Sequence, residues 1–443
     1  MLKKTFSIFF TTLILILSVF SPLTASAYEV TGVEISAKAG LLISLDTDEI
    51  LYENNIDEKV YPASIAKVMT AVLMLESDKW NPEETVTLTK EVLDMVLGTG
   101  LAVSLFKEGE QFTQLDMLYM VLVSSFGDIT YLASIIYGGS VENFVNMMNQ
   151  KAQEIGLKGT HYSNPVGLHE EETYTTARDT YLLMKYAMKH ELFNTVTSTS
   201  RHRVTTKSGN IRTLSTTNFL LDSSTNYYYQ YANQGKTGYT DKAGRCLVTT
   251  ASYNGYNYLC AVFGCDGATK HFTDSKNLYR WAFNNFSYKE VANSDEPVCE
   301  IPVELSMETD FVPLYFKKPF LTVLPNEADD STIVVKTHFK TPTVDAPIKK
   351  GDVLGQAEVI YAEKVIGKVD LIAGNDVKSS KLLLIARHIK NFFSSSYMKI
   401  VYIVIALLIV GFIIFCIWLN WDKLNKRKVR YIPYEPAEKR KRK

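Results

Sequence analysis

The sequence has few cysteines for its length, and their spacing forms no regular pattern. Five occur among 443 residues: Cys246, Cys260, Cys265, Cys299 and Cys416. Disulfide frameworks belong mainly to short secreted domains that cannot bury a sufficient core, whereas a chain of this length can build one. We therefore expect free and mostly buried thiols.

Two further signatures are missing. No Gly-x-Ser-x-Gly segment occurs, which disfavours a Ser-His-Asp hydrolase with a nucleophile elbow. The acidic run His169-Glu170-Glu171-Glu172 matches no zinc-binding spacing, so we interpret it as a solvated loop. Internal repeats are also lacking, and the composition, 46% hydrophobic and 21% charged, is that of an ordinary globular protein.

The amino-terminal segment predicts export. Lys3 and Lys4 precede an apolar run from Phe6 to Phe20, and Ala25-Ser26-Ala27 follows. This order is typical of a signal peptide with a small-residue cleavage site, which we place at residues 1–27. An uncleaved membrane anchor is the alternative. No cysteine follows the run, so a lipoprotein anchor is excluded.

A second apolar run lies near the other end of the chain. Residues 400–419 are uncharged, and at ~1.5 Å per residue they span roughly 30 Å, the thickness of a bilayer core. Residues 420–443 hold ten Lys and Arg against three Asp and Glu, and positive flanks stay cytoplasmic. The sequence therefore predicts a single-pass protein of the cell membrane, with its main domain on the extracellular, cell-wall side and a cytoplasmic tail.

The exported part is acidic. The whole chain has a formal net charge of −1. Without its two basic ends, residues 28–419 carry about −10 by simple counting. An acidic domain argues against nucleic acid as a partner.

The order of periodic segments predicts the domains. A hairpin over 40–53 precedes apolar helices that begin after Thr113, Ser140 and Thr176, the last of them reaching about residue 190. Strands follow from about 235 to 263, with Asn254-Gly255 as a two-residue turn that pairs Thr249 with Cys260, and a helix over 278–286 closes the unit. We expect an α/β domain at 28–290, in which an antiparallel sheet packs with a helix cluster, a small all-β domain at 296–376 and a stalk at 377–399.

One stretch carries the chemistry. Ser64 and Lys67 stand three residues apart, and nearly every position from 65 to 75 is apolar. Because i and i+3 share a helix face, the Lys67 ammonium can approach the Ser64 hydroxyl. Burial lowers the pKa of a lysine, and a neutral lysine can take the proton of an attacking serine. A structural serine with a snorkelling lysine is the alternative, since Ser104/Lys107 and Ser396/Lys399 have the same spacing.

Two later motifs separate Ser64 from those pairs. Ser64-Ile65-Ala66-Lys67, Ser125-Phe126-Gly127 and Lys236-Thr237-Gly238, in this order, resemble the motif set of the penicillin-binding D-alanyl-D-alanine carboxypeptidases. The flanking segments Asn164-Pro165-Val166-Gly167-Leu168 and Thr217-Asn218-Phe219 resemble the family as well. The resemblance covers nearly the whole exported part and implies a transpeptidase/β-lactamase-like fold followed by a β domain.

The resemblance also implies roles. Ser64 is the nucleophile, which is acylated by a peptidoglycan stem peptide. Lys67 is its general base, and Ser125 relays a proton to the leaving amine. The substrate-binding set implied is Lys236, Thr237, Gly238 and Tyr239: the first two hold the terminal carboxylate, and the backbone N–H groups of Ser64 and Tyr239 form the oxyanion hole. The family needs no metal or cofactor, and β-lactams inhibit it.

One position departs from the family pattern. The middle motif is Ser-x-Asn, and Gly127 stands where the asparagine belongs. The alternative to an active carboxypeptidase is therefore a catalytically weak or inactive peptidoglycan-binding protein of the same fold. We expect Gly127→Asn to raise the rate of acylation about tenfold. A β-lactamase is a poorer interpretation, because it needs neither the β domain nor the membrane span.

Overall fold

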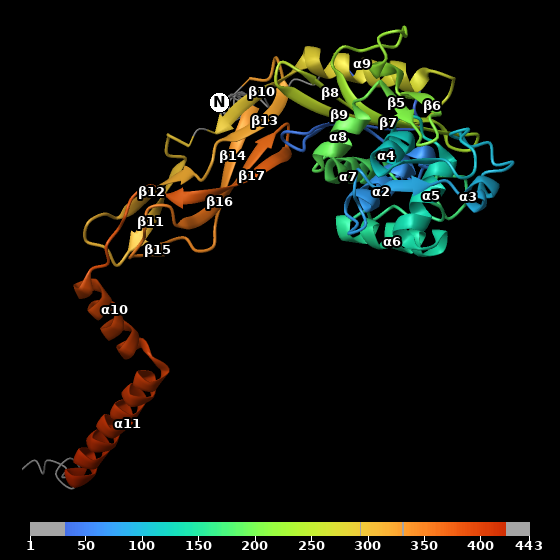
Figure 1. Ribbon diagram of the computed structural model, residues 1–443. Coiled ribbons are helices and arrows are strands. Elements are labelled where there is room, and N and C mark those ends of the chain that lie inside the picture. The colour runs from blue at the N-terminus through green and yellow to red at the C-terminus, as the bar shows by residue number, and fades with distance from the viewer. Residues whose placement is uncertain (1–31, 293, 330–331, 422–443) are drawn as a thin grey trace, which may run out of the picture. The chain divides into compact units, whose positions relative to one another are not determined.

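The computed structural model describes residues 32–292, 294–329 and 332–421 (Figure 1). The predicted signal peptide at 1–27 and all but the first two residues of the basic tail at 420–443 lie outside this part. By their internal contacts the residues form two units. The first holds residues up to Asn293 with Lys318–Lys336 and Ala357–Val369, and the second holds the rest. This division does not follow chain order, and the predicted boundaries 28–290 and 296–376 stay predictions.

A five-stranded antiparallel sheet is the centre of the first unit (Figure 1). In spatial order its strands are β2 (Ile50–Asn54), β1 (Ala39–Ser44), β9 (Tyr256–Cys265), β8 (Gly244–Tyr253) and β7 (Ala232–Thr240). Thr249 pairs with Cys260, as the Asn254-Gly255 turn predicts. Because β7 is the last strand, one row of its backbone groups is unpaired within the sheet.

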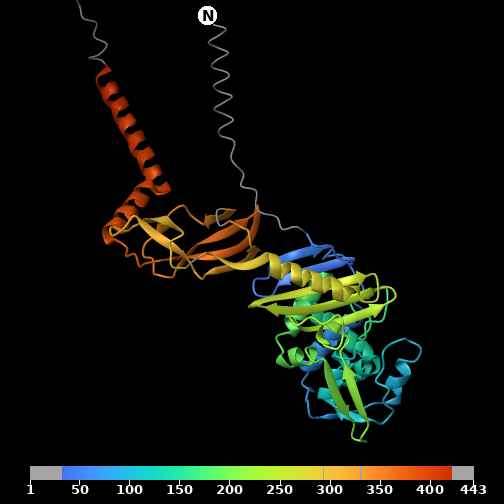
Figure 2. The same cartoon turned by 90° about the horizontal axis from the view of Figure 1, so that it is seen from above.

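The two faces of the sheet bury different side chains, because residues alternate along a strand. Leu41 and Ile43 pack with the main helix cluster, whereas Leu42 and Val262 pack with α9 (Lys270–Asn285). Figures 1 and 2 show α9 lying across one face of the sheet. The helices on the opposite face are α2 (Lys67–Leu75), α4 (Gln114–Leu122), α5 (Gly127–Gly138), α6 (Val141–Ile155), α7 (Ala177–Ala187) and α8 (Glu191–Thr197).

Side-chain caps fix where three of these helices begin. Thr113, Ser140 and Thr176 each accept a hydrogen bond from the backbone N–H three residues on, which confirms the predicted starts. The prediction that the helix after Thr176 reaches about residue 190 is wrong. The helix ends at Ala187, and His190 instead precedes α8. The closing helix begins at Lys270, eight residues before the prediction.

Shorter elements complete the first unit. They are η1 (Ala63–Ala66), α3 (Lys90–Met95), η2 (Phe219–Leu221), the pair β3 (Thr85–Thr87) and β4 (Gln111–Thr113), the pair β5 (Arg201–Thr205) and β6 (Ile211–Ser215), and the pair β10 (Phe286–Ala292) and β13 (Phe320–Pro325). All five cysteines are free; Cys246, Cys260 and Cys265 are buried, as expected. Cys246 and Cys260 lie on opposite faces of the sheet.

The second unit is rich in strands and then helical. It contains β11 (Cys299–Glu304), β12 (Phe311–Phe316) and β15 (Val344–Asp345). Three further strands have some of their residues in each unit: β14 (Ile333–Phe339), β16 (Val353–Tyr361) and β17 (Lys364–Ala373). A β-rich region therefore follows the α/β domain, as predicted. Helix α10 (Lys381–Ser394) occupies the predicted stalk. Helix α11 (Ser396–Leu419) contains an 18-residue stretch with a mean hydropathy of 3.3 and is long enough to cross a membrane.

Candidate active site

Ser64 and Lys67 meet where a short turn becomes a helix. Ser64 lies in the 3₁₀ turn η1, and Lys67 is the first residue of α2. Lys67 Nζ is 2.9 Å from Ser64 Oγ and 3.0 Å from the carbonyl oxygen of Val166. The predicted approach of the two side chains is therefore present.

The environment of Lys67 favours its neutral form. The side chain is fully buried. Burial, and then the nearby charge of Lys236, hold the pKa of Lys67 well below its usual value, although Asp128 opposes this. A neutral amine beside a serine hydroxyl can act as a base.

The loop at 164–168 supplies the second acceptor of Lys67. Asn164 Oδ1 accepts hydrogen bonds from the backbone N–H groups of Gly167 and Leu168, which fixes the loop. Gly167 has φ +77°, and a Cβ there would lie 1.9 Å from the carbonyl oxygen of Ala63. Glycine is required at this position because the loop and the Ser64 turn are in direct backbone contact.

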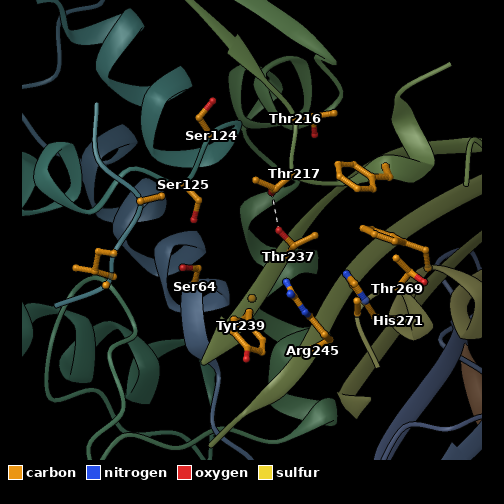
Figure 3. Close-up of a pocket in the computed structure, with 17 residues that line it drawn as sticks. Ser64, Ser124, Ser125, Thr216, Thr217, Thr237, Tyr239, Arg245, Thr269 and His271 are labelled. Atoms are coloured by element: carbon orange, nitrogen blue, oxygen red, sulfur yellow. Dashed lines mark hydrogen bonds between the residues drawn. The ribbon is translucent and has the colours of Figure 1, made fainter. Parts of the chain in front are cut away.

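Strand β7 forms the opposite wall. A Cβ on Gly238 would come within 3.2 Å of the Ser64 backbone nitrogen, so glycine lets the strand approach the turn. Lys236 is buried, which lowers its pKa to about 7, and its Nζ donates to the carbonyl of Thr237. The Thr237 hydroxyl donates to Thr217 Oγ1 at 2.6 Å (Figure 3).

Ser125 contributes the third hydroxyl. Its φ is +62°, a conformation that residues other than glycine seldom adopt and that marks functional sites when it persists. Its Oγ is buried and has no hydrogen-bond partner among the described residues. Figure 3 shows the hydroxyls of Ser64 and Ser125 directed into the same space, whereas Ser124 points away and donates to the carbonyl of Ser215.

The residues that follow Ser125 provide no side-chain amide. Gly127 begins α5, and its backbone N–H donates to the carbonyl of Ala102 at 2.7 Å. A Cβ on Gly127 would meet Leu101 Cδ1 at 2.7 Å. Asp128 is fully buried and accepts from the Ser104 backbone N–H and hydroxyl, the latter at 2.5 Å.

Ser64, Ser125 and Thr237 line one cavity of about 580 Å³ (Figure 3). Sequence reasoning missed Arg245, whose guanidinium points toward Thr237 and lies 4.0 Å from the Tyr239 ring centroid. The register of the β7–β8 hairpin could have located this residue, because Arg245 pairs with Tyr239, which directly follows the third motif. His271, at the start of α9, also lines the cavity; burial lowers its pKa to about 4.

The other two Ser-x-x-Lys pairs do not join this cavity. The Ser104 hydroxyl is bonded to Asp128 and not to Lys107, and Ser396 begins the apolar helix α11. Tyr239 keeps its side chain 49% exposed at the rim, where its hydroxyl donates to Asp241.

Comparison with known proteins agrees with this geometry. The family described as D-alanyl-D-alanine carboxypeptidase (peptidase S11) matches residues 24–267, and the family described as penicillin-binding protein 5, C-terminal domain, matches residues 286–379. D-alanyl-D-alanine carboxypeptidase DacF of Bacillus subtilis is 28% identical over 78% of this chain and 86% of its own, and DacC of Escherichia coli is 28% identical over 82% and 90%. The crystal structure of penicillin binding protein 5 from Haemophilus influenzae superposes with a TM-score of 0.65 at 25% identity, covering 79% of this chain and 100% of that one. The chain therefore belongs to the peptidase S11 family of D-alanyl-D-alanine carboxypeptidases and carries the penicillin-binding protein 5 type of carboxy-terminal domain.

Proposed function

We propose that the protein is a serine-type carboxypeptidase that removes the terminal D-alanine from peptidoglycan stem peptides. The observation that carries this proposal is the contact between Lys67 Nζ and Ser64 Oγ, 2.9 Å apart, with the lysine buried and its pKa lowered. This pair supplies a base and a nucleophile, and Ser64 lines a cavity that the cationic Arg245 also lines.

The reaction proceeds in two steps. Ser64 Oγ attacks the carbonyl carbon of the penultimate D-alanine while Lys67 takes its proton. The backbone N–H groups of Ser64 and Tyr239 stabilise the oxyanion, and Ser125 relays the proton from Lys67 to the amine of the departing D-alanine. The peptide C–N bond breaks, a Ser64 ester remains, and Lys67 is neutral again. Water then attacks the ester while Lys67 accepts its proton; the ester C–O bond breaks, Lys67 returns the proton to Ser64 Oγ, and the shortened peptide leaves with a new carboxylate.

The terminal carboxylate of the substrate is held at the other end of the cavity. Thr237 offers a hydroxyl, and Lys236 a charge next to it. Arg245 adds a guanidinium, a group that binds carboxylates in a bidentate manner. A substrate without this carboxylate should bind poorly.

Intact-mass measurement with a penicillin tests the nucleophile. The full-length protein in detergent should gain the mass of one penicillin. Ser64→Ala should gain none, and Ser124→Ala, whose hydroxyl points away from the cavity, should gain one as wild type does. An adduct that persists in Ser64→Ala would contradict the assignment.

A specific observation keeps a second function open. The wall beside Ser125 carries Gly127 and Leu101 where the family has an amide. The second proposal is a peptidoglycan- and β-lactam-binding protein with little or no turnover. Release of D-alanine from a synthetic pentapeptide separates the two: an adduct with penicillin but no D-alanine above the Ser64→Ala background would favour the binding protein.

The apolar helix α11 supports a membrane location. Helix α10 precedes it and exposes Leu382, Ile385, Ile389 and Phe392, which suits the bilayer surface. We propose that the chain crosses the membrane once, with the Ser64 domain outside and the basic tail inside. Protease added to intact protoplasts should then digest the domain and spare a tag after Lys443; loss of the tag would contradict this orientation.

A further inference from the structure

A second pocket opens on the first unit, away from the Ser64 cavity. It has a volume of about 360 Å³ and lies between α9 and the tyrosine-rich segment before β7. None of its lining residues lines the Ser64 cavity. They are Tyr228, Tyr229, Gln230, Tyr231, Tyr253, Lys276, Arg280, Phe283 and Asn284.

Two cations stand together in this pocket. Lys276 and Arg280 are one helical turn apart on α9, a spacing at which like charges repel each other. Lys276 Nζ donates to the carbonyl of Tyr228 at 3.1 Å, and no carboxylate among the described residues forms an ion pair with either side chain. Burial and the charge of Arg280 lower the pKa of Lys276. An anion between the two side chains would relieve this repulsion.

The remaining wall is aromatic and amide-bearing. Tyr231 packs against Tyr253 at 4.5 Å between ring centroids and against Phe283 at 6.2 Å, which holds the wall rigid. Tyr253 is 37% exposed and Tyr228 42% exposed, so ring surface remains available. The exposed side chains of Gln230 and Asn284 offer paired donors and acceptors. Ring faces, amides and cations together suit a sugar ring that carries an acidic group.

The pocket and the Ser64 cavity are separate, but neighbouring residues connect their walls. Tyr227 directly precedes the pocket segment, and its hydroxyl donates to Thr269 Oγ1 at 3.0 Å, a residue of the cavity. Along α9, His271 lines the cavity and Arg280 lines the pocket. Their separation of nine positions corresponds to roughly 14 Å along the helix axis. A polymer chain is long enough to reach both.

We propose that this pocket binds an acidic saccharide segment of the cell-wall polymer whose peptides enter the Ser64 cavity. Lys276 and Arg280 hold an oxyanion, and the faces of Tyr228 and Tyr253 support the adjoining sugar ring. The choice of polymer rests on the proposed function. A carboxylate on the glycan chain and a phosphodiester of an attached wall polymer offer the same chemistry to these side chains.

Sedimentation of the full-length protein with purified cell walls tests the proposal. Lys276→Gln/Arg280→Gln should bind about tenfold more weakly than wild type, and Tyr228→Ala several-fold more weakly. A matched control, Lys158→Gln/Lys207→Gln, removes the same charge from two exposed lysines elsewhere and should bind as wild type does. Thermal melts and the rate of penicillin labelling confirm that each variant is folded.

Soluble competitors identify the ligand. Two competitors are compared: glycan strands freed of peptide, whose sugars carry free carboxylates, and phosphodiester polymers released from the wall. We expect one of them to displace the wild-type protein from the cell walls. The competitor that does so identifies the source of the bound oxyanion. The proposal is overturned if the pocket variant binds like wild type, if the control loses equal affinity, or if only free acidic peptides compete. Penicillin labelling is a separate readout: its absence in wild type would contradict the catalytic proposal and leave the wall-binding result to decide this one.

Discussion

The side chain of Leu101 occupies the space that a side chain at position 127 would enter. A Cβ built on Gly127 would lie 2.7 Å from Leu101 Cδ1 and 2.9 Å from Leu101 Cβ, closer than such atoms approach. Gly127 does not have a positive φ, so a neighbouring side chain and not the backbone conformation demands glycine. The two residues therefore pack against each other beside the hydroxyls of the Ser64 cavity.

This pair changes the expected effect of restoring the asparagine. Gly127→Asn alone should lower stability by about 1–3 kcal/mol through overpacking and should not accelerate acylation. Leu101→Gly/Gly127→Asn frees the space and should label with fluorescent penicillin about tenfold faster than wild type.

Leu101→Gly alone is the control for the enlarged wall and should not be faster. If the double variant, folded by thermal melt, labels no faster than Leu101→Gly, the amide is not what limits this site.

The contact between Gly167 and Ala63 predicts a second effect. Gly167→Ala should destabilise the protein by several kcal/mol, because the new methyl group meets a backbone carbonyl in addition to strain at φ +77°. It should also slow acylation, since the neighbouring Val166 carbonyl holds Lys67.

Gly156→Ala is the matched control. Gly156 has φ +88° and nothing within 4 Å of its Cβ position, so only the left-handed strain of about 1–2 kcal/mol remains. Urea unfolding and penicillin labelling measure both variants. Equal losses of stability would show that the loop yields to the methyl group.

Titration of Lys236 should limit activity at alkaline pH. Burial lowers the pKa of Lys236 to about 7, and under the proposed function only its charged form would attract the substrate carboxylate. As pH rises through 7, kcat/KM should therefore fall toward tenfold per pH unit, while kcat changes less because the bound carboxylate stabilises the charge.

Lys236→Arg stays charged throughout this range. Its kcat/KM profile, however low in absolute value, should lack the alkaline fall. A fall at the same pH in this variant would assign the titration to another group.

The buried Asp128 makes the effect of Ser104→Ala depend on pH. Burial raises the pKa of Asp128 above its usual value, and the Ser104 hydroxyl stabilises the charged form. Loss of that hydroxyl should reduce stability at pH 7 by about 1.5–3 kcal/mol. Folding raises the pKa of this carboxyl, so its charged form costs stability as pH rises, and the Ser104 hydroxyl offsets part of that cost by stabilising the charged form. The loss in the variant should therefore be larger at pH 7 than at pH 4, toward the protonated form of Asp128. Urea unfolding at both pH values checks this, and an equal loss at both would contradict it.

Local patterns in the sequence predicted those parts of the fold that depend on neighbouring residues. The caps at Thr113 and Ser140 and the register of Thr249 with Cys260 were correct, because each follows from a few adjacent positions. The start of α9 was missed, since Lys270 begins the helix without a side-chain cap.

The motif residues of the site could be predicted from the sequence, but the other residues that form the cavity walls could not. Of the residues that the motifs predict, Ser64 and Ser125 line one cavity in the structure, and the buried Lys67 contacts Ser64. Leu101 comes from a loop with no periodic pattern, so its position against Gly127 depends on tertiary packing alone. Arg245 required knowledge of which strand pairs with the third motif.

The position of β1 has a consequence for the order in which the domain assembles. Leu42 in β1 pairs with Cys260 in β9, 218 positions further along the chain. The central part of the sheet therefore cannot close until nearly the whole first unit has been synthesised, and such distant pairing slows folding. An exported chain would cross the membrane with the β1–β2 hairpin lacking its partner, its apolar face and open edge exposed to other chains. The success of export should thus depend on the time that passes between the translocation of this hairpin and that of β9.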